Sequence, residues 1–375
     1  MKRIAVLTSS RADFGIYLPL LKKLKEDPFF ELSIIAFGTH LSADHGETIS
    51  QIELSGFDVP YKIKTTPVND SSRDIAESMG KTIEGFANFW DAHKKAFDLV
   101  FCLGDRYEMF SAVMSGVPFQ IEFAHIHGGE RTLGAIDNIF RHAITIASKY
   151  HFTSSSESTK RVKELTESGE HIYNVGALGL DNINTIDTLS IEQFQEEWGV
   201  DLSHKTILTT FHPETVALMM NAEYGKILIN AIERLSEYQV IITMPNADTE
   251  GNVLRSLFIL KTTGSKRVTL IENLGVVSYL TAMKYCSFLL GNTSSGIIEA
   301  SSFGKYVINL GDRQKGRASG RNVLHVPITV ESIIESVKWI EDAGFYKLGN
   351  LYYNGGAADK IIDVLKNTID DEFSL

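Results

Sequence analysis

The chain has 375 residues, of which 43% are hydrophobic and 22% charged, and its net charge of −11 comes from 36 basic and 47 acidic side chains. The composition is typical of a soluble globular protein, and the length predicts two domains rather than one. The acidic balance argues against a general nucleic-acid surface, although a few local arginines could still bind a small anion.

Cys102 and Cys286 are the only two cysteines and lie far apart in the sequence. This spacing is typical of neither a disulfide framework nor a zinc site. No apolar run approaches the ~18 residues of a transmembrane helix. The run that ends at Thr8 is too short for a signal peptide, so we expect a cytoplasmic protein without a membrane partner.

Short apolar stretches alternate with amphipathic ones along the first half of the chain. In chain order the predicted strands and helices cover residues 3–10, 14–27, 32–40, 74–96, 97–105 and 106–116. Nearly continuous apolar strands that alternate with helices predict a parallel sheet covered on both faces. We therefore expect a doubly wound α/β domain.

The pattern breaks near residue 175, where the sequence becomes polar and acidic, and a second series of strands begins near residue 205. We place a first Rossmann-like domain at residues 1–172 and a second one, the nucleotide-binding domain, at residues 173–356. A final amphipathic helix over residues 357–375 is expected to pack back on the first domain. Two such domains would bind a ligand at the carboxyl ends of their strands.

In the second half, the stretch GNTSSGIIEA follows a predicted strand and begins a helix. Backbone amides and hydroxyls at such a helix start can bind phosphate, and a glycine lets the ligand approach the backbone. An acid one turn later could bind a ribose. The alternatives are an ordinary serine N-cap and a solvated helix charge. The candidates are Asn292, Ser294, Ser295, Gly296 and Glu299.

Further candidates could hold a diphosphate. The stretch GDRQKGRASGR carries Arg313, Lys315, Arg317 and Arg321, which form either a diphosphate clamp or a solvated loop. Arg11, His212 and Asn246 each lie at or near the end of a predicted strand in TSSRADFG, TTFHPET and ITMPNAD. His212 could bind phosphate or move protons, or could be structural.

In the first half, Asp105 directly follows a predicted strand in LGDRYE. It is either a general base or the N-cap of the next helix. Asp137 and Arg141 are four residues apart and share one helical face, where the alternative is a surface ion pair.

The stretch HIHGGE contains His125, His127 and Glu130 around a glycine pair. On an extended segment the two histidines would face the same way, as in a metal-binding pair. Zinc needs a third and usually a fourth ligand, and the nearby acids follow no recognised metal spacing. We therefore favour a set of groups that moves a proton on a sugar, with Gly128 and Gly129 leaving room for the ligand.

Six motifs occur in order: TSSRADFG, LGDRYE, HIHGGERTLGAIDNIFRH, FHPET, GNTSSGIIE and INLGDRQKGR. Together they resemble the hydrolysing UDP-N-acetylglucosamine 2-epimerases, in particular the bacterial branch that serves sialic-acid-type sugars. The resemblance implies a GT-B-type fold with an interdomain cleft. It implies conversion of UDP-N-acetylglucosamine and water to N-acetylmannosamine and UDP, through 2-acetamidoglucal. It implies no metal and no cofactor, and a homodimer, for which we expect contacts over residues 80–90.

By similarity, Asp105 and Asp137 match catalytic carboxylates of that family, and Arg141 and His212 match residues of its active site. Arg11, Ser294, Ser295 and Glu299 match nucleotide-binding positions. Many relatives have a glutamate where this chain has His127. Either His127 or Glu130 therefore takes that proton-transfer role here.

Three other readings stay open. The same reaction could act on UDP-2,4-diacetamido-2,4,6-trideoxyglucose, whose methyl and second acetamido groups would favour a more apolar pocket. A glycosyltransferase of this fold would bind UDP but would have less use for the acids. A non-catalytic nucleotide-sugar-binding protein is a third possibility.

Overall fold

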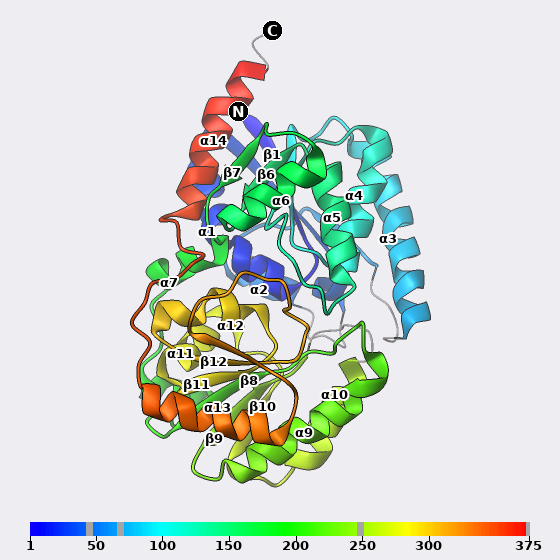
Figure 1. The fold of residues 1–375 in the computed structure, drawn as a ribbon. Helices are drawn as coiled ribbons and strands as arrows, with labels where there is room; N and C mark the ends of the chain where they lie inside the picture. Colours follow the sequence, from blue (N-terminus) through cyan, green and yellow to red (C-terminus); the bar gives the residue numbers. More distant parts are fainter. Residues whose placement is uncertain (43–47, 66–70, 246–250, 373–375) are drawn as a thin grey trace. The chain divides into compact units, whose positions relative to one another are not determined.

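A computed structural model describes residues 1–42, 48–65, 71–245 and 251–372 (Figure 1). Its contacts divide the chain into unit 1, which is Met1–Glu130, Asp137–Thr185 and Tyr352–Leu375, and unit 2, which is Arg131–Ile136 and Ile186–Leu351. The division falls after Thr185 rather than after residue 172, because the helix that ends at Thr185 packs on the first helix of unit 1.

Unit 1 is built on a parallel sheet whose seven described strands have the order β3-β2-β1-β4-β5-β6-β7. The order reverses between β1 and β4, and at such a point the carboxyl ends of the strands leave a crevice for ligands. The strands are β1 Lys2–Thr8, β2 Phe30–Phe37, β3 Tyr61–Ile63, β4 Leu99–Leu103, β5 Phe123–Ile126, β6 Tyr150–Thr153 and β7 Ile172–Asn174.

Helices cover both faces of this sheet (Figure 1). They are α1 Arg11–Glu26, α2 Ile49–Leu54, α3 Ser72–His93, α4 Tyr107–Gly116, α5 Asp137–Ala147, α6 Ser156–Thr166, α7 Asp181–Thr185 and α14 Ala357–Glu372, with 3-10 turns at Gly38–Leu41, Val117–Phe119 and Leu178–Leu180.

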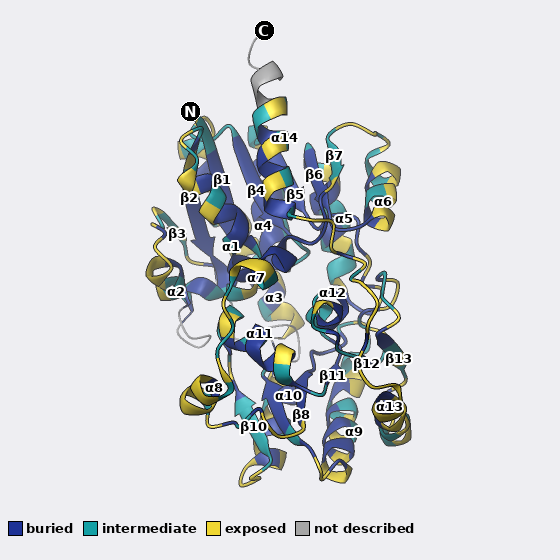
Figure 2. Cartoon of the chain, turned by 90° about the vertical axis from the view of Figure 1, so that its left-hand side faces the viewer, coloured by how far each residue is buried: buried dark blue, intermediate teal, exposed yellow. Residues whose placement is uncertain are grey.

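The central strand β1 serves two hydrophobic cores, because its successive side chains point to opposite faces of the sheet. Ile4 and Val6 pack with α1 and α14, whereas Ala5 and Leu7 pack with α3 and α4. The inner strands β4, β5 and β6 of this sheet are buried throughout, and β1 is buried from Ile4 onward (Figure 2). Buried strands of this kind explain the nearly continuous apolar runs in the sequence.

The C-terminal helix α14 packs along α1. Its first amides are capped from within unit 1, since the backbone N–H groups of Ala357 and Ala358 donate to the Asp181 carboxylate at 3.1 and 2.7 Å. A carboxylate at a helix N-terminus also interacts favourably with the helix dipole.

Part of the proposed dimer contact over residues 80–90 is buried inside unit 1. Phe86, Phe89 and Trp90 of α3 belong to its core, and Ile83 is the exposed apolar residue of that stretch, at 40%. The aromatic part of the predicted contact is therefore wrong, because these rings cover the sheet.

Unit 2 repeats the same topology with six described strands in the order β10-β9-β8-β11-β12-β13, again all parallel. The strands are β8 Thr206–Thr210, β9 Gln239–Thr243, β10 Val268–Ile271, β11 Phe288–Gly291, β12 Val307–Leu310 and β13 Val323–Val326. The helices are α8 Ile191–Trp198, α9 Asn221–Arg234, α10 Gly251–Thr262, α11 Gly275–Tyr285, α12 Ser294–Ile298 and α13 Val330–Ala343, with 3-10 turns at Leu218–Met220 and Ala300–Phe303. The strand order of unit 2 reverses between β8 and β11.

Among the helices of both units that the structure describes, none is long and apolar enough to cross a membrane.

Candidate active site

Asp105 stands at the carboxyl end of β4, beside the point of strand reversal in unit 1. The turn before it is held by His125, whose ring Nε2 lies 2.9 Å from the carbonyl oxygen of Gly104. Burial lowers the pKa of His125 to about 3, so the ring is neutral and its one N–H donates to that carbonyl. The N-cap of α4 is Arg106, without a side-chain bond. Asp105 is therefore not the helix cap, and its side chain is available for another task.

Arg141 is a buried connector rather than part of a surface ion pair, with 2% of the residue exposed. Its Nη2 pairs with the Asp105 carboxylate, and its Nη1 donates to the carbonyl oxygen of His127 at 2.8 Å. The same Nη1 lies 3.6 Å from Oε2 of Glu130. One guanidinium therefore fixes Asp105, His127 and Glu130 relative to one another.

His125 and His127 do not face the same way, so the shared face that an extended segment would give them is not formed. The strand β5 ends at Ile126, and His127 has a left-handed backbone with a φ of 64°. This turn takes the His127 ring to Glu130, with Nδ1 3.2 Å from Oε1, whereas His125 faces Gly104. Within the described ranges, no group of three or more histidines, cysteines and acids is placed to hold a metal ion.

The glycine pair of HIHGGE serves packing inside unit 1. A Cβ on Gly128 would lie 2.9 Å from Nδ1 of His125, and one on Gly129 would lie 2.4 Å from the carbonyl oxygen of Ser158. Gly129 also has a φ of 76°, which favours glycine. The expected room for a ligand at these glycines is therefore taken up by His125 and by α6.

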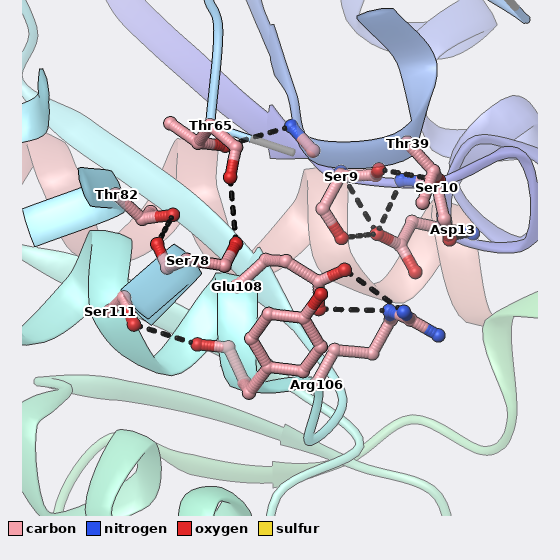
Figure 3. A network of polar contacts seen from close by, with 12 residues as sticks. Ser9, Ser10, Asp13, Thr39, Thr65, Ser78, Thr82, Arg106, Glu108 and Ser111 are labelled. Atoms are coloured by element: carbon pink, nitrogen blue, oxygen red, sulfur yellow. Dashed lines mark hydrogen bonds and ion pairs between the residues drawn. The ribbon is translucent and has the colours of Figure 1, made fainter. Parts of the chain in front are cut away.

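Two further candidates begin helices at the same edge of the unit 1 sheet. Asp137 is the first residue of α5 and is half-buried, and Arg11 is the first residue of α1. The start of α1 is a capping box, in which the Asp13 carboxylate accepts from the amides of Ser9 and Ser10 at 2.9 and 3.1 Å (Figure 3).

A buried ion pair lies near this capping box. The Arg106 guanidinium donates to Glu108 through Nε at 3.1 Å and Nη2 at 2.9 Å, and Glu108 is 1% exposed (Figure 3). Because the pair is bidentate, it fixes the direction of the guanidinium beside Asp105 in sequence. Neither residue was singled out from the sequence, where Arg106 and Glu108 look like an ordinary charged helix start.

In unit 2, Asn292 joins the ends of three strands. Its Oδ1 accepts from the backbone N–H of His212 at 2.7 Å, and its Nδ2 donates to the carbonyl oxygen of His212 at 2.9 Å. Its own carbonyl oxygen accepts from Gln314 at 2.9 Å and from Arg313 at 3.4 Å. The structure thus brings together His212 after β8, Asn292 after β11 and Arg313 after β12.

Glu214 fixes the start of the arginine-bearing loop, a role that the sequence analysis missed. Its Oε1 accepts from the backbone N–H groups of Asp312 and Arg313 at 2.7 and 3.1 Å. Burial nevertheless raises the pKa of Glu214, and the two bonds oppose that shift. Of the four basic residues of this loop, Arg317 is buried and Arg313 is half-buried. Lys315 and Arg321 are exposed. Only the first two therefore fit a rigid anion clamp.

The helix start of GNTSSG is capped by Thr293, whose hydroxyl accepts from the Ser295 amide at 3.4 Å, rather than by a serine. The Ser295 hydroxyl donates to the Glu299 carboxylate. Burial raises the pKa of Glu299 to about 7, against the opposing effect of that bond, and burial likewise raises the pKa of Tyr279 beside it. Ser294 is half-buried in the first turn of α12.

Gly296 and Asn246 complete the predicted nucleotide-binding set. A Cβ on Gly296 would lie 3.0 Å from Cγ1 of Val307, so this glycine lets α12 pack against β12. Asn246 lies outside the residues that the structure describes.

Ser154 is a further residue that the sequence did not reveal. It follows β6, is 1% exposed, and its hydroxyl donates to Oε1 of Glu130 at 2.6 Å. In the sequence it is one of three consecutive serines, and the next one, Ser155, is the N-cap of α6. Nothing in that pattern distinguishes a capping serine from one that binds a buried acid.

Over almost its whole length, the chain is similar in sequence to known sugar-nucleotide epimerases. The sequence model of the UDP-N-acetylglucosamine 2-epimerase family matches residues 22–366. The UDP-N,N'-diacetylbacillosamine 2-epimerase (hydrolyzing) of Legionella pneumophila is 31% identical over 98% of this chain and 96% of its own. The polysialic acid biosynthesis protein P7 of Escherichia coli is 33% identical over 98% of this chain and 95% of its own.

Solved structures of epimerases have this fold. The UDP-GlcNAc 2-epimerase of Neisseria meningitidis, bound to UDP-GlcNAc, is similar with a TM-score of 0.81 and 18% identity over 98% of this chain and 100% of its own. The UDP-GlcNAc 2-epimerase of Methanocaldococcus jannaschii, in complex with UDP-GlcNAc and UDP, is similar with a TM-score of 0.79. It is 18% identical over 98% of this chain and 100% of its own. The two parallel sheets of seven and six strands therefore have the GT-B-type fold. By its sequence the chain belongs to the UDP-N-acetylglucosamine 2-epimerase family, whose members are enzymes acting on UDP-sugars.

Proposed function

We propose that the protein is a hydrolysing UDP-N-acetylglucosamine 2-epimerase, which converts UDP-N-acetylglucosamine and water to N-acetylmannosamine and UDP. The observation that carries the proposal is the cluster of Asp105, Arg141, His127 and Glu130 at the carboxyl ends of β4 and β5. A set of proton-transfer groups at this edge has a use in epimerisation, whereas a glycosyltransferase or a sugar sensor has less need of it. The similarity to a relative from Legionella pneumophila that is named as a hydrolysing 2-epimerase supports the hydrolysing reaction.

The first stage is an elimination. The C2–H and C1–O bonds of the sugar break, a C1–C2 double bond forms, and UDP leaves with the electron pair of the C1–O bond. Asp105 is assigned to the C2 proton, since Arg141 holds it in one place and no helix cap occupies it. A correctly positioned base contributes about 10² to 10⁴ in rate.

The second stage adds water to the double bond, with the hydroxyl going to C1 and a proton to C2. Inversion at C2 requires that this proton arrive on the face opposite to the one that lost a proton, so a second group is needed. His127 is assigned to that proton, and Asp137 at the start of α5 is assigned to the water.

The leaving UDP is assigned to unit 2. Arg313, Arg317 and His212 would stabilise the charge that develops on the diphosphate, as donors placed in advance do in other leaving-group sites. The first turn of α12 with Ser294 and Ser295 adds amides and hydroxyls, and Glu299 would accept from the ribose. Arg11 and Asn246 remain in the proposed nucleotide-binding set.

A second substrate has specific support. The relatives from Legionella pneumophila and Campylobacter jejuni are both named for N,N'-diacetylbacillosamine, at 31% and 32% identity. The same chemistry on UDP-2,4-diacetamido-2,4,6-trideoxyglucose is therefore the alternative, and it changes only the groups at C4 and C6.

The test is to supply each UDP-sugar separately and to compare kcat/KM for UDP release, with the sugar product identified by NMR. We expect free N-acetylmannosamine from UDP-N-acetylglucosamine. A higher kcat/KM for the diacetamido sugar would transfer the assignment to that substrate. A UDP-linked manno sugar as the product would show a non-hydrolysing enzyme, and turnover of neither sugar would overturn the proposal.

A further inference from the structure

His127 ends in a nitrogen that the protein leaves without a partner. Its side chain is 8% exposed, its Nδ1 faces Glu130, and among the described residues no hydrogen-bond partner exists for its buried Nε2. A buried polar atom without a partner costs free energy, and such atoms concentrate where a ligand or a proton is handled. Nε2 of the imidazole is therefore one end of the pair that can handle a proton, while Oε2 of Glu130 lies 3.6 Å from the Arg141 guanidinium.

Glu130 is held by donors of the protein itself. Oε1 accepts from Ser154 and faces Nδ1 of His127, and Oε2 lies beside Nη1 of Arg141. The Ser154 hydroxyl and the positive charge of Arg141 both favour the ionised form of this carboxylate, which can only accept hydrogen bonds. The hydrogen of the His127 ring must then sit on Nδ1, which leaves the lone pair on Nε2.

Ser154 has no other task in the local structure. The cap of α6 is Ser155, whose hydroxyl accepts from the Ser158 amide at 3.2 Å. Ser154 is buried, and its side chain donates to Glu130, its one hydrogen-bond partner within the part of the chain that the structure describes. The backbone next to it is tied to the same site, because the His127 amide donates to the Phe152 carbonyl at 3.0 Å.

We propose that Glu130 is a positioning residue that acts through His127, and that Ser154 fixes the Glu130 carboxylate for this purpose. Nε2 of His127 takes up a solvent proton, and the ring becomes an imidazolium stabilised by Glu130. Nε2 then returns the proton to C2 of the sugar. The inference rests on the proposed function, and it decides between the two candidates that the sequence left open.

The charged and titratable groups around His127 decide how the replacement of Glu130 changes the pH dependence of kcat. Glu130 faces its ring, Arg141 binds its backbone, Asp105 neutralises Arg141, and His125 lies on the preceding strand and is neutral. Glu130→Gln keeps an acceptor for the Nδ1 hydrogen but removes the charge that stabilises the imidazolium. The limb of the pH profile that reports His127 should therefore move to lower pH.

The test compares Glu130→Gln, Ser154→Ala and His127→Gln in C2 deuterium incorporation and UDP release. We expect kcat to fall about 10²- to 10⁴-fold for His127→Gln, about 10- to 100-fold for Glu130→Gln and less for Ser154→Ala, with KM nearly unchanged. In the His127→Gln background, Glu130→Gln should have no further effect, because residues that act as a unit are not additive. Glu122→Gln, an exposed acid of unit 1, is the matched control.

An additional loss from Glu130→Gln in that background would show that Glu130 transfers a proton itself and would overturn the proposal. An unshifted pH profile for Glu130→Gln would do the same. A second readout does not depend on turnover: ¹⁵N NMR of histidine-labelled full-length protein should show the His127 hydrogen on Nδ1. A hydrogen on Nε2 contradicts the dyad, whereas absence of turnover by the wild type contradicts only the proposed function.

Discussion

At the scale of single residues, Glu299 carries a carboxyl group that its surroundings favour in the neutral form. Its pKa is about 7 because of burial, against an ordinary value of 4.5. An acid whose pKa is raised by folding adds stability at low pH, and this contribution is lost as the pH rises from about 4.5 through about 7. At about 1.4 kcal/mol per pKa unit, the ionised group costs unit 2 on the order of 3 kcal/mol, an upper limit because the side chain is partly exposed.

Glu299→Gln should therefore raise the unfolding midpoint at pH 8 and change it little at pH 5. It should also weaken UDP binding at pH 8, because the proposed acceptor for the ribose is lost. Thermal unfolding and calorimetric titration with UDP measure the two effects. Glu223→Gln, an exposed acid of α9, is the control. Equal stabilisation by Glu299→Gln at both pH values would contradict the raised pKa.

The positions of candidate site residues could be predicted from the sequence where a motif places them at a strand end. Asp105, His212 and Asn292 all follow strands, as expected. The relation between His127 and Glu130 could not be predicted, because it depends on a left-handed residue just after β5. No periodicity signals such a residue, and without it the two histidines would have shared a face. Ser154 is brought to Glu130 by strand pairing between β5 and β6, which sequence spacing does not show.

At the scale of elements, the loop after β5 depends on the close approach of α6. Gly129→Ala would place a Cβ 2.4 Å from the Ser158 carbonyl, at a backbone φ of 76°. We expect a loss of about 2 to 4 kcal/mol in the stability of unit 1, since both the overlap and the left-handed backbone oppose the side chain.

Urea unfolding of the Gly129→Ala variant measures this loss, and kcat should fall with it because His127 and Glu130 flank the glycine pair. Gly169→Ala is a suitable control, because its Cβ would meet nothing within 4 Å. A Gly129→Ala variant with wild-type stability would show that α6 gives way and that the packing is not required.

The sheet of unit 1 also buries several neutral histidines. Burial lowers the pKa of His40 to about 4, of His125 to about 3 and of His151 to about 4. A histidine whose pKa is lowered by folding stabilises the fold above about pH 6.5, and this stability is lost as the pH falls towards the folded value.

Unit 1 should therefore lose about 2 kcal/mol per buried histidine between pH 7.5 and pH 5. The double variant Trp198→Phe/Trp339→Phe leaves Trp90 of α3 as the tryptophan that reports unit 1 during urea unfolding. Adding His151→Gln should reduce the acid loss, since Nδ1 of His151 has no partner among the described residues to lose. An unchanged pH dependence in that variant would contradict the assignment.

Some elements could not be predicted because they are short. The edge strands β3, β7 and β13 span only three or four residues, too few to show a period. In α3 the buried face includes Ser78 and Thr82, so the apolar positions alone marked that face incompletely. The central strands were recognisable because burial on both faces of the sheet leaves a continuous apolar run. The helix α1 was recognisable by the helical spacing of its apolar residues.

At the scale of the whole molecule, the two units share one strand order but differ in chemistry. Unit 1 holds the proposed proton-transfer cluster around Arg141, and unit 2 holds the proposed UDP-binding residues His212 and Arg313, with Asn292 and the first turn of α12. Between pH 7 and pH 5 their stabilities should change in opposite directions, because unit 1 buries neutral histidines and unit 2 buries Glu299.

Repetition of a strand–helix pattern was enough to predict two doubly wound domains. The exact boundaries of the two units could not be predicted, because nothing in the composition of residues 131–136 indicates that they belong to unit 2. That segment is joined to unit 2 by the Leu133 amide, which donates to the Lys315 carbonyl at 2.9 Å. Its partner is 182 residues away along the chain, beyond the reach of local sequence patterns.

The central claim is that the cluster around Asp105 exchanges the C2 proton while the UDP bond is broken. The most direct measurement is turnover of UDP-N-acetylglucosamine in deuterated water by the wild type and by Asp105→Asn, with the product analysed by NMR and mass spectrometry. We predict one deuterium at C2 of free N-acetylmannosamine, in step with UDP release, and loss of both in Asp105→Asn. Product without deuterium at C2, or an Asp105→Asn variant as active as the wild type, would contradict the account.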